Sequence, residues 1–337
     1  MHAAARSILD PPPAAARVRF ADGFGARFLL TVDTEEEFDW NAPLTRTGHR
    51  LDHVTRLAKF QQFCEGIGVA PVYLVDWPVA NSSAAQDIIG PAVAAGRAEV
   101  GLQLHPWVNP PHREDINPAN SFPGNLPRAL ERDKLLALKD RVERTFATAP
   151  LIYRAGRYGA GPHTAELLAE AGIAVDSSVR ARFSYAAEGG PDYTAHPITP
   201  YWLDDARRVF ELPLTTTFWG LLRNHGTRIY RATGDGAPLR GLFARTGLLE
   251  RIALTPEGVN LGEAVRGIDM AIDEQLDVLV LSFHSPSLVP GNTPYVHDET
   301  GLDRLYDWWR GVCGYLLQRG VRPTSVAQIV AAARAAR

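Results

Sequence analysis

The 337-residue sequence contains only two cysteines, Cys64 and Cys313, which lie far apart in the chain. Two thiols at this separation exclude a framework of several disulfides and a Cys-x-x-Cys metal site. Sparse cysteine usage is typical of proteins from reducing compartments, so we expect a cytoplasmic protein with two buried thiols.

Targeting and polyanion-binding features are also missing. Met1 to Val18 contains no apolar stretch of the signal-peptide kind, and no apolar run elsewhere approaches the length of a membrane span. The formal net charge is -3 and no basic run is present, which argues against nucleic-acid and membrane partners. The expected partner is therefore a small-molecule or neutral substrate, and the oligomeric state stays open.

The chain does contain a series of short apolar runs, rich in β-branched residues, that each end in a polar residue. Runs of this length are typical of strands buried on both faces of a parallel sheet. The seven runs end at Asp33, Asp76, His105, Arg154, Asp176, Thr215 and His284. Because reactive side chains of α/β barrels gather at the carboxyl ends of the strands, these endings predict one catalytic face.

Helical patterns separate most of the runs, as expected for consecutive βα units. They cover residues 51–65, 83–95, 127–146, 162–171, 261–275 and 302–318. Residues 1–22 are rich in Ala and Pro and are expected to form a poorly ordered arm. Residues 23–337 are expected to form a single barrel, in which the Gly- and Pro-rich stretch 181–259 makes an excursion over the catalytic face.

Six segments at or near these strand ends carry a resemblance to a known family. They are Thr31–Glu35, Glu99–Trp107, Tyr153–Gly159, Val175–Ser178, Glu211–Pro213 and Leu281–Leu288. In this order they resemble the motifs of the polysaccharide deacetylases, carbohydrate esterase family 4, from about Phe28 to about Ser325. The resemblance implies an irregular (β/α)7 barrel of the polysaccharide deacetylase type, which agrees with the seven strand endings.

The resemblance also implies roles for four residues at the strand ends. Asp33 stands at the place of the base that activates water, and His284 at the place of the acid that protonates the leaving amine. Arg154 stands where relatives orient the base, and Asp176 where they hold the catalytic histidine in one tautomer. From the residues alone, His284 is also consistent with a hydrogen-bonded strand end, and Arg154 with Asp176 is consistent with an ordinary buried ion pair.

The metal-binding positions of the family are altered in this chain. Relatives usually carry a second carboxylate next to the base, where Thr34 stands here. Some relatives skip one residue, which would give the role to Glu35, two residues beyond Asp33 and on the same face of an extended strand. The two histidines of the family's H-x-x-x-H motif are replaced by Gln103 and Trp107, with His105 between them.

Glu35, His105 and Gln103 are therefore the candidate ligands of one divalent metal. Zinc is the favoured ion, because catalytic zinc takes roughly three protein ligands with a water and prefers imidazole nitrogen. His112, in the loop that follows, is a further candidate ligand. The alternative is that Glu35 belongs to a solvated acidic loop and His105 is a hydrogen-bonded structural residue, which would leave the protein without a metal.

Aromatic residues follow several of the strand ends. Flat rings at a barrel mouth are suited to stacking on the apolar faces of sugar rings, although loop tryptophans also simply pin loops onto a barrel. Tyr158 lies in a glycine-rich loop that, by resemblance, places donors near the oxyanion. The candidate substrate-binding residues are Trp40, Trp77, Trp107, Tyr158 and Trp219.

Together these features predict a hydrolase of a C–N amide bond, with Asp33 as base and His284 as acid. The expected reaction is deacetylation of an N-acetylated sugar or polysaccharide-related substrate. Two alternatives stay open: a non-catalytic sugar-binding relative that has lost its metal site, and an amidohydrolase on a small non-sugar amide.

Overall fold

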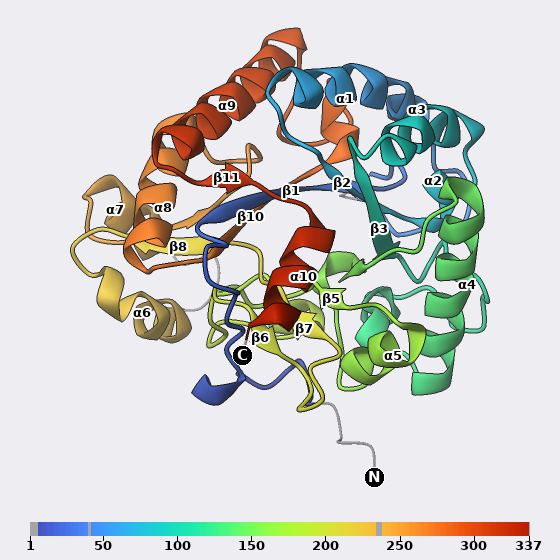
Figure 1. The fold of residues 1–337 in the computed structure, drawn as a ribbon, viewed down its shortest axis with the longest axis horizontal. Coiled ribbons are helices and arrows are strands. Elements are labelled where there is room, and N and C mark those ends of the chain that lie inside the picture. Colours follow the sequence, from blue (N-terminus) through green and yellow to red (C-terminus); the bar gives the residue numbers. More distant parts are fainter. Residues whose placement is uncertain (1–5, 40–41, 234–237, 337) are drawn as a thin grey trace.

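A computed structural model describes residues 6–39, 42–233 and 238–336 and shows a curled sheet surrounded by helices (Figure 1). The strands of the main sheet are β1 (Arg27–Thr34), β2 (Val72–Val75), β3 (Glu99–Leu104), β4 (Ile152–Ala155), β5 (Val175–Asp176), β6 (Tyr201–Trp202), β7 (Phe210–Glu211), β10 (Val278–His284) and β11 (Arg322–Pro323). They are ordered β10-β1-β2-β3-β4-β5-β7-β6, and β11 pairs with the start of β1.

Seven of these strands correspond to the seven apolar runs of the sequence. From β10 through β1 to β7 every neighbouring pair is parallel, and only β6 runs antiparallel to β7. The predicted barrel of the polysaccharide deacetylase type is confirmed as a curled parallel half-barrel. Because the strands are parallel, their carboxyl ends lie at one edge of the sheet.

The two ends of the curled sheet approach one another without forming a ladder in the described part of the chain. The backbone N–H of Thr215 donates to the carbonyl of Val280 (3.2 Å), and that of Leu254 donates to the carbonyl of Thr215 (3.1 Å). Beside this seam, β8 (Thr216–Trp219) and β9 (Glu250–Ala253) form a separate antiparallel pair. The irregularity of the barrel is concentrated here, between β7 and β10.

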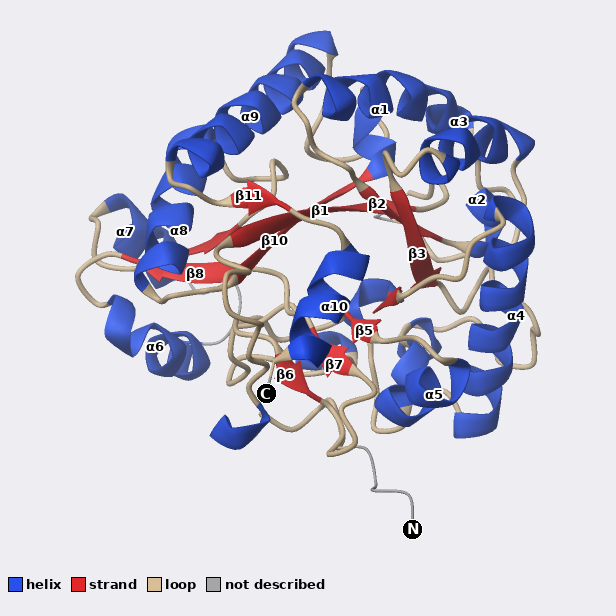
Figure 2. Cartoon of the chain, viewed as in Figure 1, coloured by secondary structure: helices blue, strands red, loops and turns tan. Residues whose placement is uncertain are grey.

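The predicted helices cover the outer side of the sheet (Figure 2). They are α1 (Leu57–Gly66), α3 (Ser83–Ala94), α4 (Arg128–Phe146), α5 (Thr164–Ala171), α8 (Leu261–Asp273) and α9 (Glu299–Gln318). Helices that the sequence patterns did not indicate are α2 (Trp77–Ala80), α6 (Gly226–Thr233), α7 (Pro238–Arg245) and α10 (Val326–Ala335). None of the helices in the described ranges combines the length and apolarity that a bilayer span requires.

The expectation of a poorly ordered N-terminal arm is wrong for residues 6–22. Ile8 is completely buried in the main hydrophobic core, and the backbone N–H of Val18 donates to the carbonyl of Pro200 (2.9 Å). The apolar residues among the alanines and prolines supply buried contacts that offset the entropy of ordering this segment.

The stretch 181–259 contributes to both the sheet and the pocket at its edge. It contains β6 and β7 of the main sheet, the β8–β9 pair, and helices α6 and α7. Tyr185, Glu188, Thr255 and Glu257 line the pocket described below. We retain as a proposal that its loops restrict access to this pocket within one barrel formed by 23–337.

One buried acid on α4 gives a testable pH dependence of stability. Glu131 is 2% exposed and accepts a hydrogen bond from the Thr164 hydroxyl (2.5 Å). Burial raises the pKa of Glu131 from 4.5 to about 7. An acid with a raised pKa holds its proton more tightly in the folded chain, so its contribution to stability declines as pH rises from about 4.5 to about 7.

We therefore expect Glu131→Gln to remove part of this decline. The contribution lost by the wild type across this window is about 3 kcal/mol at most, from about 1.4 kcal/mol per pKa unit. Chemical denaturation at several pH values measures it. Glu166→Gln, at an exposed ion pair with Arg128, is the matched control and should keep the wild-type slope. An unchanged slope in Glu131→Gln would contradict the assignment.

Candidate active site

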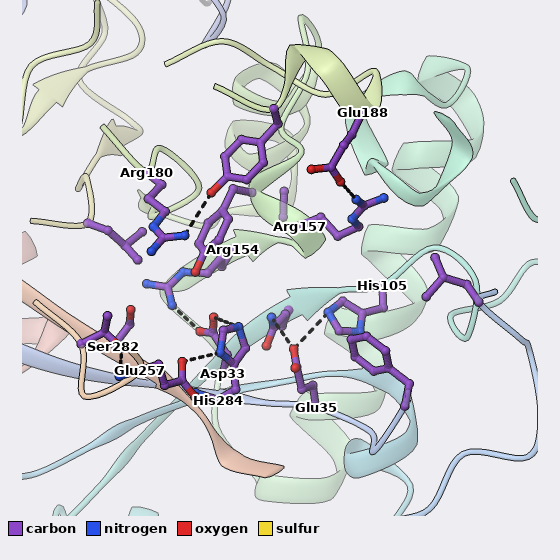
Figure 3. A pocket seen from close by; sticks show the side chains of 18 of the residues that line it. Asp33, Glu35, His105, Arg154, Arg157, Arg180, Glu188, Glu257, Ser282 and His284 are labelled. Carbon is purple, nitrogen blue, oxygen red and sulfur yellow. Dashed lines mark hydrogen bonds and ion pairs between the residues drawn. The ribbon is translucent and has the colours of Figure 1, made fainter. Parts of the chain in front are cut away.

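A cavity of about 890 Å³ lies at the carboxyl edge of the sheet. Side chains from four strands or strand ends line it, among them Asp33, His105, Arg154 and His284 (Figure 3). The parallel ladder between β1 and β10 places Asp33 directly beside His284, and the ladder between β3 and β4 places Gln103 beside Arg154. The register of the strands therefore brings together residues that are far apart in the sequence.

Asp33 is held by a completely buried arginine. Arg154 Nη1 donates to Asp33 Oδ1, while Nη2 donates to the Thr31 hydroxyl (3.1 Å) and Nε to the carbonyl of Ser177 (2.9 Å). These bonds fix the guanidinium from three directions, and the Asp33 carboxylate receives a charge-assisted hydrogen bond. The arrangement places a guanidinium cation directly against the buried carboxyl group of Asp33.

His284 is held by Glu257, which the sequence reasoning missed. Nδ1 of His284 lies 2.7 Å from Glu257 Oε2, and the backbone N–H of His284 donates to Glu257 Oε1 (3.1 Å). The hydroxyl of Ser287 donates to the same oxygen (2.6 Å). The other ring nitrogen, Nε2, faces Asp33 Oδ2 at 3.7 Å. A carboxylate on Nδ1 fixes the tautomer and leaves Nε2 directed at the pocket.

Burial by itself lowers the pKa of His284, but the carboxylates around it reverse that effect. Glu257 is the largest of these influences, followed by Glu35, and together with Asp33 they raise the pKa of His284 to about 10. The imidazole is therefore protonated at neutral pH.

The role implied for Asp176 is wrong. Asp176 Oδ1 accepts from the backbone N–H (3.0 Å) and the hydroxyl (2.5 Å) of Ser178, and it does not line the pocket. Burial raises its pKa to about 7. Glu257 follows β9 within a Pro-Glu-Gly turn of the 181–259 stretch, where no apolar run marks a strand end. A carboxylate in such a turn carries no sequence signal that separates it from an ordinary loop acid.

Glu35, His105 and Gln103 come together as the sequence predicted. The Nε2 atoms of Gln103 and His105 lie 3.2 and 3.4 Å, respectively, from Glu35 Oε2. Glu35 Oε1 and Gln103 Oε1 are buried without a hydrogen-bond partner. Unsatisfied buried oxygens are costly, and two of them beside an imidazole nitrogen are a donor set that fits a divalent cation. Burial raises the pKa of Glu35 to about 8.

A second layer of carboxylates orients His105. Its Nδ1 lies 2.9 Å from Glu36 Oε2, and the indole N–H of Trp107 donates to Glu36 Oε1 (2.7 Å). Asp76 Oδ2 accepts the backbone N–H of Glu36 (2.7 Å). Donor atoms of Glu36, Asp76 and His105 lie within 4.8 Å of one another, so this group is a second possible cation site. Hydrogen bonds within the protein already use both oxygens of Glu36.

The alternative of a solvated acidic loop is wrong, since Glu35 and Glu36 are 2% and 0% exposed. Burial raises the pKa of Glu36 and raises that of Asp76 well above its usual range. His112 is not among the residues that line the pocket, and its imidazole is instead close to Lys134 and Arg46, so we do not retain it as a ligand.

The predicted aromatic residues divide into two groups. Tyr158 and Trp107 line the pocket, although Trp107 is 3% exposed and stacks on His105 with ring centroids 4.4 Å apart. Trp77 and Trp219 lie away from the pocket, against Arg141 (5.7 Å) and Arg266 (4.5 Å). The expectation that these two face a substrate is not supported. Trp40 lies outside the described residues.

The loop that carries Tyr158 has an unusual backbone. Arg157 and Tyr158 both adopt positive φ values, 55° and 59°, in a region that L-residues rarely occupy. A Cβ atom at Gly156 would lie 2.5 Å from the carbonyl oxygen of Leu104 and 2.6 Å from the His105 ring. Only glycine permits this close approach between the loop and the His105 strand end.

A solved structure shares the fold of this chain over nearly its whole length. It is a candidate polysaccharide deacetylase from Mycobacterium smegmatis, with 20% sequence identity, 97% of this chain and 96% of that chain covered, and a TM-score of 0.52. The chain has the fold of the polysaccharide deacetylases.

Two further solved structures match this chain with lower TM-scores than the Mycobacterium smegmatis structure. One is a candidate polysaccharide deacetylase from Pseudomonas aeruginosa PAO1, with 14% identity, 91% and 89% coverage, and a TM-score of 0.48. The other is a GH57 branching enzyme from Thermococcus kodakaraensis, with 12% identity, 91% and 71% coverage, and a TM-score of 0.49. No model of a protein family and no curated protein matches the sequence. The likeness therefore concerns the deacetylase fold alone, and the reaction must be argued from the residues.

Proposed function

We propose that this protein is a hydrolase that cleaves the C–N amide bond of an N-acetylated sugar or polysaccharide-related substrate. The observation that carries the proposal is the pair Asp33 and His284, 3.7 Å apart at neighbouring strand ends in one cavity. Each is held by its own partner, Arg154 or Glu257. Amide hydrolysis needs a base for water and an acid for the leaving amine, and these two side chains supply them.

Asp33 acts as the base in this proposal. Its carboxylate accepts a proton from water, and the buried Arg154 orients this carboxylate through a charge-assisted hydrogen bond. His284, protonated through Nε2, donates a proton to the amine nitrogen as the C–N bond breaks. Glu257 holds Nδ1 and stabilises the imidazolium that this role requires.

Tyr158 is the proposed donor to the oxygen that becomes negatively charged. Burial raises the pKa of the Tyr158 phenol well above its usual range, so the hydroxyl keeps its proton. A protonated donor that lines the cavity can stabilise developing negative charge without reorganisation.

Glu35, His105 and Gln103 are the residues that would hold a divalent metal, with zinc the preferred ion. A metal held there would supply a Lewis acid for the acyl carbonyl and for a water molecule. In this scheme Glu36 does not bind the metal but fixes the His105 ring, so that Nε2 faces Glu35.

The direct test of the proposal is release of acetate from N-acetylated sugars and short oligosaccharides by the purified protein, with zinc, with cobalt and without added metal. Release above the buffer control supports the hydrolase. Binding of these sugars without any acetate under all three conditions would instead identify a non-catalytic sugar-binding protein.

The two possible cation sites predict different metal contents. If Glu35, His105 and Gln103 hold zinc, Glu35→Gln should abolish stoichiometric zinc because it removes a ligand. Glu36→Gln should only weaken zinc affinity by about 10- to 100-fold, because Glu36 is hydrogen-bonded to the ligand His105 and does not itself bind the ion. Elemental analysis and competition with a chelator measure both quantities, and His112→Ala is the control expected to retain zinc. If Glu36→Gln instead abolished stoichiometric zinc and Glu35→Gln only weakened zinc affinity, the ion would be assigned to Glu36, Asp76 and His105.

A further inference from the structure

Several charged side chains that line the cavity lie against a group of opposite charge. The pairs are Asp33 with Arg154, Glu188 with Arg157, and Glu257 with His284. Arg180 departs from this pattern. Within the described ranges, no carboxylate lies within ion-pair distance of its guanidinium, although Arg180 lines the same cavity.

Aromatic groups surround the Arg180 guanidinium instead. Its Nη1 donates a long hydrogen bond to the Tyr185 hydroxyl (3.5 Å), and its Cζ atom lies 4.0 Å from the ring centroid of Phe183 and 5.5 Å from that of Tyr158. Burial raises the pKa of both tyrosines, so their hydroxyls remain neutral. The rings therefore flank the cation and leave its charge without a formal counter-charge.

The backbone fixes where this cation lies. Arg180 follows β5 and forms an isolated parallel bridge with Leu214, which continues the line of β7. In Figure 3 its side chain lies on the opposite side of the cavity from His105, beyond the Asp33–Arg154 pair. A ligand whose acyl group reaches Asp33 and His284 can therefore extend toward Arg180 within a volume of about 890 Å³.

A half-buried cation without a counter-ion is costly, and an anionic ligand relieves that cost. The planar fork of a guanidinium matches the oxygens of a carboxylate or phosphate, and both can be bound through two parallel hydrogen bonds. Neutral phenol hydroxyls beside it add donors and no repulsion. The surroundings of Arg180 thus favour an anion supplied by the ligand.

We propose that the substrate carries an anionic oxygen group, a carboxylate or a phosphate, which Arg180 binds at the far side of the cavity from His105. Arg180 is then a specificity-determining residue that selects acidic N-acylated sugars over neutral ones. The statement about the N-acyl group rests on the hydrolase function proposed above, whereas the preference for an anion rests on Arg180 and its surroundings.

Binding of three matched ligands tests the preference separately from turnover. The ligands are N-acetylglucosamine, which is neutral, N-acetylmuramic acid, which adds a carboxylate, and N-acetylglucosamine 6-phosphate. Their dissociation constants are measured by calorimetry on the full chain carrying His284→Gln, so that hydrolysis does not interfere. We expect at least one acidic ligand to bind about 10- to 100-fold more tightly than the neutral sugar, as for a charge-assisted hydrogen bond. The stronger of the two identifies the anion.

Arg180→Gln in the same background should reduce this preference to within about threefold, with little change for the neutral sugar. Arg157→Gln is the matched control, because Arg157 lines the same cavity but is already paired with Glu188. That control should keep the preference. Arg180→Lys retains the positive charge but loses the planar guanidinium, so its preference for the acidic ligand should be intermediate. This variant replaces Arg180→Gln in the test if Arg180→Gln does not fold.

The outcomes separate this inference from the proposed hydrolase. Equal affinity for all three ligands, or a preference that survives Arg180→Gln, would overturn the anion site even if the wild type releases acetate. An Arg180-dependent preference in a protein that releases no acetate would support the anion site and reject the hydrolase. Loss of the preference in Arg157→Gln, with Arg180→Gln unaffected, would assign the anion to Arg157 and reject the role of Arg180.

Discussion

Asp33→Asn is expected to slow acetate release by about 10² to 10⁴-fold, the usual effect of removing a general base. An amide cannot accept the proton from water, and the substitution is nearly isosteric. It also leaves Arg154 buried without its counter-charge, which costs up to about 3 to 5 kcal/mol of stability. Rates should therefore be compared at a temperature where circular dichroism shows that the variant is folded.

Glu188→Gln provides the matched control for this effect. Glu188 is also an acid that lines the cavity and pairs with an arginine, Arg157, but it takes no part in the proposed chemistry. Its removal should leave turnover within about threefold of the wild type, since exposed ion pairs contribute little. If Asp33→Asn retained more than a tenth of wild-type activity, another group would have to be the base.

The strand ends could be predicted because a buried parallel strand leaves a plain sequence pattern. Each apolar run had to end where the chain left the core, and parallel pairing then placed those ends at one edge. β5 and β7 are only two residues long, yet their positions in the sheet are those that the runs indicated. Asp33 beside His284, and Glu35 near His105, follow from this register.

The partners of these residues could not be predicted in the same way. Glu257 and Arg180 lie in loops, where no periodic burial pattern fixes the direction of a side chain. Glu36 stood within a run of acids that resembled an exposed loop, and only the approach of Trp107 and His105 shows that it is buried. Loop residues acquire their roles from contacts with segments distant in the sequence.

The tryptophans illustrate a related limit. A tryptophan shortly after a strand end lies near the catalytic edge of the sheet. Its position in the sequence does not show whether the ring faces the pocket or packs against a helix. Trp77 begins α2, whose N-cap is Asp76, and this helix start directs the ring toward Arg141 on α4. Trp219 ends β8 and packs on Arg266 of α8. Both rings pin secondary structure onto the barrel, which is the alternative that their sequence positions left open.

His284 should give the second large effect, and its comparison with Glu257 separates the acid from the residue that positions it. His284→Ala should reduce turnover by about 10² to 10⁴-fold at every pH, because the group that protonates the leaving amine is gone. Glu257→Gln keeps the imidazole and one hydrogen-bonding oxygen, so the expected loss is smaller.

The pH profile distinguishes the two variants further. Glu257 is the largest influence that raises the pKa of His284 toward about 10, so its replacement by a neutral amide lowers that pKa. An acid is active below its pKa. The alkaline limb of kcat/KM in Glu257→Gln should therefore move to lower pH, while the activity that remains at low pH approaches that of the wild type. A limb that stays in place while activity falls uniformly would mean that Glu257 only supports the loop. A wild-type limb retained in His284→Ala would show that the acid is a different residue.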